Sequence, residues 1–274
     1  MKIIKTIKFL LSVLLILFVV SCAKKSVGPD ENTGAPDDLN DGWEVSAPFF
    51  QDVSIDTLET LSQAIENGEF GDVHSLLMAR NGHLIFERYY QTFNPVIVQR
   101  IYSVTKSITS ALIGIAVDRG YINNLDQLII EFFPQYSDII NADPRKQNIT
   151  IRHLLTMTAG LEYDEFTYPF NDWRNTWVQM HTSDNWIQFV LELPSVADPG
   201  TEFTYNSGCT LLLAGILFAV TGQHADELAD EWLFEPLGII SRMWNYENGN
   251  SDGLPDTGGG LWLNLRSMAK FAQM

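Results

Sequence analysis

Two residues of the chain have the types and the spacing that acyl transfer requires. Ser103 and Lys106 are three positions apart, which places both side chains on one face of a helix. A serine hydroxyl is a poor nucleophile until a neighbouring base takes its proton. Lys106 is the only charged residue between positions 101 and 117, and burying a charged amine is costly. The pair therefore predicts a nucleophile and its base.

The spacing alone is a weak signal, because it also occurs at Ser21–Lys24 and Ser267–Lys270. A purely structural interpretation fits Ser103 and Lys106 equally well, with the serine as an N-cap and the lysine reaching solvent. The surrounding sequence has to decide between them.

A second stretch supplies this context. Residues 198–222, DPGTEFTYNSGCTLLLAGILFAVTG, combine a Pro-Gly turn, a tyrosine in a tight loop and a long apolar helix. They resemble the second motif of the serine β-lactamase-related superfamily, which includes class C β-lactamases, penicillin-binding carboxypeptidases, esterases and nylon-oligomer hydrolases. Three more stretches resemble this superfamily in the same order: HSLLMARNGHLIFERYY, ITIRHLLTMTAGLEY and GGGLWLNLRSMAKFAQM.

The resemblance implies a role for each matching residue. Ser103 would be the acyl-accepting nucleophile and Lys106 its base, and the backbone N–H of Ser103 would supply half of an oxyanion hole. Tyr205 would complete the proton network by protonating the leaving group and later activating water. The alternative for Tyr205 is a loop tyrosine that packs its ring. No cofactor is implied, and the histidines show no metal-ligand spacing.

The sequence departs from the superfamily in two places. Class C β-lactamases have an asparagine that holds the substrate amide where this chain has Ser207, and a hydroxyl lacks the carbonyl and NH₂ pair of an amide. We therefore predict that Ser207 binds the substrate and that the chain resembles the esterase or nylon-oligomer hydrolase branches of the superfamily. The third motif, Lys or His two places before Gly on a C-terminal strand, is not found in the sequence. We expect the missing strands downstream of Met274, and we expect residues 22–274 alone to fold poorly and to be inactive.

Local patterns predict an α+β fold. Asn81-Gly82 separates two strand-like runs, as in a type I′ hairpin. Gly258–Gly260 predicts a tight turn, and residues 160–182 are aromatic-rich and irregular. Helices are predicted at residues 55–68, 103–119, 149–158, 186–193, 211–220 and 226–234, the second of them apolar on nearly all sides and hence buried. Together with the resemblance, this predicts a β-lactamase/transpeptidase-like fold: an antiparallel sheet flanked by helices, a mostly helical region, and missing C-terminal strands.

The N-terminus has the pattern of an exported bacterial lipoprotein. Three lysines precede an apolar run, residues 9–20, that is short for a membrane-spanning helix. Val-Val-Ser-Cys at 19–22 resembles a lipobox; the alternative is an uncleaved membrane anchor. We predict a signal peptide over 1–21, a lipid on Cys22, a flexible tether over 22–50 and a hydrolase domain over 51–274. The protein would then be anchored to a bacterial membrane by its lipid alone, on the periplasmic side or the cell surface.

Charge and composition limit the partners. The chain has 34 acidic and 17 basic residues, for a net charge of −17, and such a surface repels nucleic acid. Cys209 has no partner if Cys22 is lipidated, and it is predicted to be an inert buried thiol. The predicted function is hydrolysis of a small-molecule ester or amide. Two alternatives stay open: a D-alanyl carboxypeptidase or β-lactamase acting on penicillin- or peptidoglycan-type substrates, and a non-catalytic binding or scaffolding lipoprotein.

Overall fold

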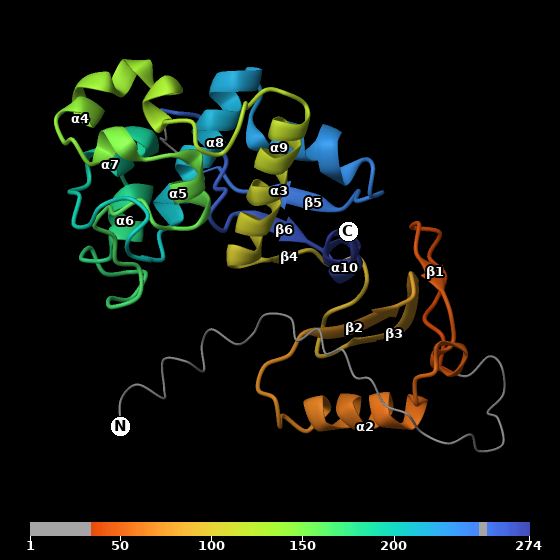
Figure 1. Ribbon diagram of the computed structural model, residues 1–274. Helices are drawn as coiled ribbons and strands as arrows, with labels where there is room; N and C mark the ends of the chain where they lie inside the picture. Colours follow the sequence, from red (N-terminus) through yellow and green to blue (C-terminus); the bar gives the residue numbers. More distant parts are fainter. Residues whose placement is uncertain (1–33, 247–250) are drawn as a thin grey trace. The chain divides into compact units, whose positions relative to one another are not determined.

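The computed structural model describes residues 34–246 and 251–274. The predicted signal peptide, Cys22 and the first part of the predicted tether lie outside the described residues. The described chain forms two compact units, each made of segments that are distant in the sequence (Figure 1). Unit 1 contains the described residues up to Gln99, with Leu237–Ser241 and Leu263–Met274, and unit 2 contains Arg100–Pro236 and Arg242–Trp262.

Unit 1 contains the predicted hairpin. Strands β2 (Ser75–Arg80) and β3 (His83–Tyr89) pair antiparallel, with a register shift at Met78/Ala79. Asn81 and Gly82 have φ values of 52° and 82°, as a type I′ turn requires. The other elements of the unit are β1 (Glu44–Val45), which pairs parallel with β3, a 3₁₀ turn (Pro48–Gln51), α2 (Ile55–Glu66) and α10 (Leu265–Gln273).

The predicted tether over 22–50 is too long, and order begins before its end. Trp43 is buried, and its indole Nε1–H donates to the backbone oxygen of Arg266 at 3.3 Å. Strand β1 follows directly and pairs with β3. A two-residue strand leaves no periodic pattern in a sequence, so the composition of this segment alone suggested a flexible chain.

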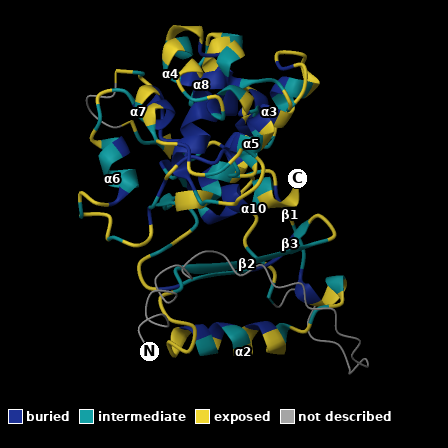
Figure 2. Ribbon diagram, turned by 60° about the vertical axis from the view of Figure 1, so that its left-hand side comes forward, coloured by how far each residue is buried: buried dark blue, intermediate teal, exposed yellow. Residues whose placement is uncertain are grey.

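Unit 2 is mostly helical. Its central helix α8 (Ser207–Thr221) is buried from Ser207 to Leu217, and Figure 2 shows it largely in dark blue. Gly215 allows close packing there, because a Cβ would lie 2.7 Å from Cδ1 of Ile187. The other helices of the unit are α3 (Thr105–Asp118), α4 (Ser137–Asn141), α5 (Ile151–Leu155), α6 (Thr176–His181), α7 (Trp186–Glu192) and α9 (Ala225–Ala229), which continues as a π turn (Asp230–Phe234). Short 3₁₀ turns lie at Tyr102–Val104, Ile129–Glu131, Pro134–Tyr136 and Lys146–Asn148.

Three short strands form a second sheet in the order β4-β6-β5: β4 (Gln99–Arg100), β6 (Leu261–Leu263) and β5 (Arg242–Trp244). They hold the segment before α3. Ile101 N donates to Leu261 O at 2.9 Å, and Leu261 N donates to Thr105 Oγ1 at 3.3 Å. These strands were not predicted, because each is too short for an alternating pattern to be visible.

The helix predicted over 103–119 begins two residues later, and it is not buried on all sides. Ser103 lies in the 3₁₀ turn Tyr102–Val104. Along α3, Ile108, Leu112 and Ile113 face the interior, whereas Ser107, Ser110 and Gly114 are exposed. The exposed positions carry serine and glycine, which are small and uncharged, so the sequence of this helix looked apolar on nearly all sides.

Within residues 34–246 and 251–274, no single helix is both long and apolar enough to cross a membrane. Helix α8 and the segment Ala225–Phe234 meet the criterion only as a pair, and they are bent by 79°.

Candidate active site

The structure brings Ser103 and Lys106 together at the start of α3. Lys106 Nζ lies 3.2 Å from Ser103 Oγ. Ser103 is exposed and Lys106 is half-buried. A molecule in solvent can therefore reach the hydroxyl, while the amine beside it is partly shielded from water.

The backbone before Ser103 is held in an unusual conformation. Tyr102 has a φ of 46°, in the left-handed region. For a residue with a side chain this costs roughly 1–2 kcal/mol. The turn is fixed by a hydrogen bond from Thr105 Oγ1 to Tyr102 O at 2.6 Å, and Arg100 lies over the Tyr102 ring, 5.3 Å from its centroid. Such outliers concentrate at functional sites, where the surrounding structure maintains them.

Lys106 is anchored by two further segments. Its Nζ donates to Ser207 Oγ at 2.9 Å and to Gly258 O at 2.6 Å. Ser207 is the first residue of α8, and Gly258 belongs to the predicted glycine turn, which the structure confirms. Three elements that are distant in sequence thus meet at one amine.

Glu165 is linked to Lys106 through Ser207. Its Oε1 accepts from Ser207 Oγ at 3.1 Å, and its Oε2 accepts from Ser207 N at 3.2 Å. Only 4% of Glu165 is exposed. Burial raises the pKa of this carboxyl above its usual value, although the nearby charge of Lys106 and the hydrogen bonds from Ser207 partly oppose the shift.

Glu165 was not among the residues predicted from the sequence. It stands in the irregular segment after α5, between Asp164 and Phe166. The only local signal is an acidic residue among aromatic ones, which does not distinguish it from the half-buried Asp164 or the exposed Glu162.

Asp256 shapes the glycine turn. Its Oδ1 accepts from Gly258 N at 2.9 Å and from Gly259 N at 3.0 Å. Arg100 completes the turn by donating from Nε to Gly259 O at 2.7 Å and from Nη2 to Asp256 Oδ2 at 3.3 Å. Burial raises the pKa of Asp256, but interactions with His181, Arg100 and the turn N–H groups outweigh it, so the pKa is lower than usual. The Asp-Thr-Gly sequence was the available signal, since aspartate often binds the backbone N–H two residues on.

The aromatic ring of Tyr205 lies next to the amine of Lys106. The ring centroid is 5.0 Å from Lys106 Nζ and 5.2 Å from the centroid of Phe166. The role of the Tyr205 hydroxyl in proton transfer stays a prediction. The predicted contact of Ser207 with substrate also stays a prediction; the structure places its hydroxyl between Lys106 and Glu165, with 3% of the residue exposed.

The other predicted residues lie apart from this cluster. Cys209 is a fully buried free thiol, which confirms the predicted burial, and desolvation raises its pKa to about 12. In the second Ser-x-x-Lys copy, Ser267 is buried in α10, and Lys270 Nζ donates to the backbone oxygens of Gly238 and Asp41. Cys22 lies outside the described residues.

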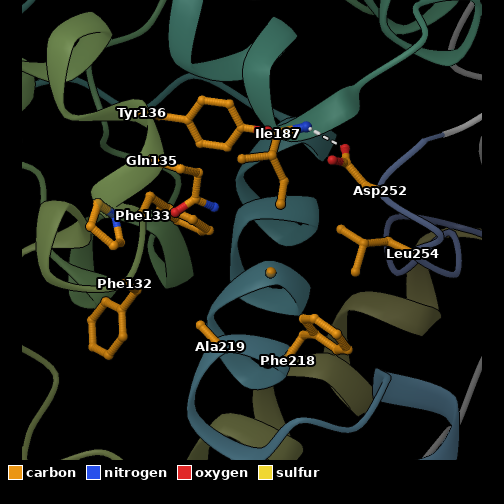
Figure 3. Close-up of a pocket in the computed structure, with 11 residues that line it drawn as sticks. Phe132, Phe133, Gln135, Tyr136, Ile187, Phe218, Ala219, Asp252 and Leu254 are labelled. Atoms are coloured by element: carbon orange, nitrogen blue, oxygen red, sulfur yellow. Dashed lines mark hydrogen bonds between the residues drawn. The ribbon is translucent and has the colours of Figure 1, made fainter.

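A cavity of about 340 Å³ in unit 2 is lined by residues from the 3₁₀ turns after α3, from α7 and from α8 (Figure 3). Its lining is mainly apolar, and the carboxylate of Asp252 accepts from Ile187 N at 3.0 Å. None of Ser103, Lys106 and Tyr205 lines this cavity. A carbonyl group that reacts with Ser103 would therefore not be bound there.

Known proteins resemble this chain in sequence and in fold. The chain is 33% identical over 161 residues to monacolin J acid methylbutanoyltransferase from Aspergillus terreus, which covers 54% of this chain but only 38% of the relative. Among solved structures, the hydrolase EstCE1, which has promiscuous acyltransferase activity, superposes with a TM-score of 0.60 at 18% identity, covering 78% of this chain and 69% of that one. An octameric penicillin-binding protein homologue from Pyrococcus abyssi gives 0.59 at 20% identity, covering 80% and 56%.

These structural matches confirm the predicted β-lactamase/transpeptidase-like fold. The family model described as Beta-lactamase matches residues 73–274, which include every element around Ser103. The chain therefore belongs to the Beta-lactamase family, and a relative of similar sequence is named as an acyltransferase.

Proposed function

We propose that this protein is a serine hydrolase that cleaves a small-molecule ester or amide through an acyl-enzyme on Ser103. One observation carries the proposal: an exposed hydroxyl lies 3.2 Å from an amine that two other segments hold in place. Ser267 and Lys270 have the same spacing and are called the decoy pair here. The amine of Lys270 donates to backbone oxygens. Spacing is therefore shared, but the serine–lysine contact distinguishes Ser103.

Acylation begins with the neutral amine of Lys106. As Ser103 Oγ attacks the substrate carbonyl carbon, its proton moves to Lys106 Nζ. The oxygen of the tetrahedral intermediate becomes negative, and the backbone N–H of Ser103 stabilises it as one oxyanion donor. The intermediate then collapses, the bond to the leaving group breaks, and the leaving group takes a proton.

Tyr205 is our proposed carrier of that last proton. The support is the position of its ring next to Lys106, and in this scheme the Tyr205 hydroxyl gives a proton to the leaving group. In the second step a water molecule gives up a proton to the same groups and attacks the acyl carbon. Ser103 regains its hydroxyl proton, and a carboxylic acid leaves.

Esters and simple amides are favoured over lactams as substrates. Ser207 stands where class C β-lactamases have the asparagine that holds the lactam amide, and its hydroxyl is bound to Lys106 and Glu165. The curated relative is named as a methylbutanoyltransferase, so an alcohol in place of water has to be tested as the acceptor.

Attachment to a bacterial membrane through a lipid on Cys22 is part of the proposal. Its support is the lysine-rich start, the short apolar run and Val-Val-Ser-Cys at 19–22. A lipid anchor would hold the hydrolase at a membrane surface outside the cytoplasm.

The test is labelling of the full-length protein with a fluorophosphonate and turnover of 4-nitrophenyl acetate, with and without added alcohol. Ser103→Ala should abolish labelling and ester turnover, because the other hydroxyl that is hydrogen-bonded to Lys106, that of Ser207, is buried. A fluorescent penicillin should label the protein far more slowly than the fluorophosphonate does.

Ser267→Ala is the matched control, because it removes the serine of the decoy pair. Labelling and turnover should stay at the wild-type level. Unchanged labelling of Ser103→Ala would overturn the assignment of the nucleophile, and fast penicillin labelling would favour the carboxypeptidase or β-lactamase alternative.

A further inference from the structure

Lys106 Nζ is in contact with three oxygen atoms, and two of them can only accept a hydrogen bond from it. Gly258 O, at 2.6 Å, is a carbonyl oxygen and can only accept. Ser207 Oγ, at 2.9 Å, has one proton, and this proton is donated to Glu165 Oε1 at 3.1 Å. Ser207 therefore has to accept from Lys106. The third oxygen is Ser103 Oγ, at 3.2 Å.

This arrangement decides where the lone pair of a neutral amine points. A neutral lysine has two N–H donors and one lone pair. Ser207 and Gly258 each take one N–H, so the remaining direction, toward Ser103, is left for the lone pair. That is the orientation in which Lys106 can accept the proton of Ser103 Oγ.

The polarity of Ser207 depends in turn on Glu165. An ionised carboxylate only accepts hydrogen bonds. Both carboxylate oxygens are used by Ser207, one by its hydroxyl and one by its backbone N–H. Since only 4% of Glu165 is exposed, water offers this carboxylate little alternative. Lys106, Ser207 and Glu165 thus form a chain of hydrogen bonds, in which Lys106 donates to Ser207 and Ser207 donates to Glu165. We call this chain the relay; no proton is transferred along it.

We infer that Glu165 is a positioning residue for acylation: through the Ser207 hydroxyl it directs the lone pair of Lys106 at Ser103. This inference rests on the proposed roles of Ser103 and Lys106. In the acylation step the proton of Ser103 moves to Lys106 Nζ as the bond from Oγ to the acyl carbon forms. The protons of Ser207 stay where they are, and Glu165 remains a carboxylate.

Glu165→Gln tests the inference because it keeps the size of the side chain and reverses the relay. The amide oxygen would accept from Ser207 N, and the NH₂ group would then donate to Ser207 Oγ. The Ser207 proton would turn toward Lys106 and occupy the lone pair. We expect the acylation rate constant, measured as the burst of 4-nitrophenolate from 4-nitrophenyl acetate, to fall by about 10²-fold. The apparent dissociation constant of the ester should change by less than about twofold, because Glu165 does not contact the substrate in this scheme.

A double-mutant cycle separates the relay from a direct effect of charge. Ser207→Ala should lower the acylation rate constant by about 10-fold or more, because one anchor of the amine is lost. In the Ser207→Ala background, Glu165→Gln should change the rate by less than about twofold, since no hydroxyl is left to turn. If the second substitution still lowers the rate strongly in that background, Glu165 acts on Lys106 directly and the inference is wrong.

Glu162→Gln is the matched control. It removes the same charge three residues away, at an exposed position, and it should leave acylation at the wild-type rate. An acylation rate of Glu165→Gln equal to that of wild type would overturn the inference. If Glu165→Gln does not fold, Ser207→Ala decides by itself, and an unchanged rate again overturns it. Failure of the proposed function is a separate outcome, in which Ser103→Ala still reacts with the fluorophosphonate.

Discussion

At the scale of single residues, the candidate site combines the proposed nucleophile and base with groups that hold them in place. A serine and a lysine three positions apart on a helix lie on the same face, but this spacing does not ensure a hydrogen bond between them. Lys106 contacts Ser103, whereas Lys270, three positions after Ser267, donates to backbone oxygens. The amine of Lys106 donates to Ser207 Oγ and Gly258 O, and these two hydrogen bonds oppose rotation of the lysine toward solvent. The anchoring of the base, more than its presence, distinguishes the site.

Glu165 provides a pH-dependent prediction at the same scale. Its pKa is raised in the folded state, mainly by burial, although Lys106 and His181 oppose the shift. A raised folded-state pKa contributes stability that is complete below the unfolded-state pKa and is lost as the pH rises through the folded-state value. In Glu165→Gln the side chain does not titrate, so the variant does not lose this stability as the pH rises. Its free energy of unfolding relative to wild type should therefore increase as the pH rises above the ordinary glutamate pKa of about 4.3.

Urea unfolding of both proteins at several pH values measures this difference. Glu162→Gln, at an exposed position, should show a nearly constant difference from wild type over the same range. A constant difference for Glu165→Gln as well would mean that the buried carboxyl titrates normally.

At the scale of elements, the turn 257–260 matters because its backbone carries Gly258 O to Lys106. Gly260 N donates to Asp256 O at 2.9 Å, which closes the turn. A Cβ on Gly260 would lie 2.8 Å from Asp256 O and 2.7 Å from Asp256 Cβ. A Cβ on Gly259 would meet nothing closer than 3.7 Å. Neighbouring glycines of one turn thus have different steric requirements.

We therefore predict that Gly260→Ala lowers the free energy of unfolding by about 1–3 kcal/mol, since overpacking shifts the backbone. It should also lower the rate of fluorophosphonate labelling, because the shift moves Gly258 O away from Lys106. Gly259→Ala, the control, should keep a labelling rate near that of wild type. Urea unfolding and labelling of the two variants measure both effects, and equal losses in the two would contradict the steric argument.

At the scale of the whole molecule, the acidic composition and the predicted lipid both bear on how the protein would attach to a membrane. A net charge of −17 opposes adsorption to anionic headgroups, so membrane attachment would depend on the lipid on Cys22. Cys22→Ser should therefore leave an unprocessed precursor without incorporated lipid in a bacterial host. Metabolic labelling with a radioactive fatty acid measures this, and Cys209→Ser is the control that should keep the label. A normally processed and labelled Cys22→Ser protein would exclude the lipoprotein proposal.

Much of the fold was predictable because its signals are local. Helical patterns located α2 and α7, and Asn81-Gly82 located the hairpin and its turn type. The Ser103–Lys106 pair was visible for the same reason, since one helical turn sets the distance between positions three apart. In each case the decisive interactions lie within a few residues of one another.

The tertiary structure alone decided what surrounds Lys106. Its contacts with Ser207 and Gly258 join residues 101 and 152 positions apart, and Glu165 enters only through Ser207. Periodicity carries no information about such contacts, because they depend on how α8, the glycine turn and an irregular segment pack against α3. The sequence by itself determined which residues could react, and long-range packing determined the direction in which the hydrogen bonds of the base point.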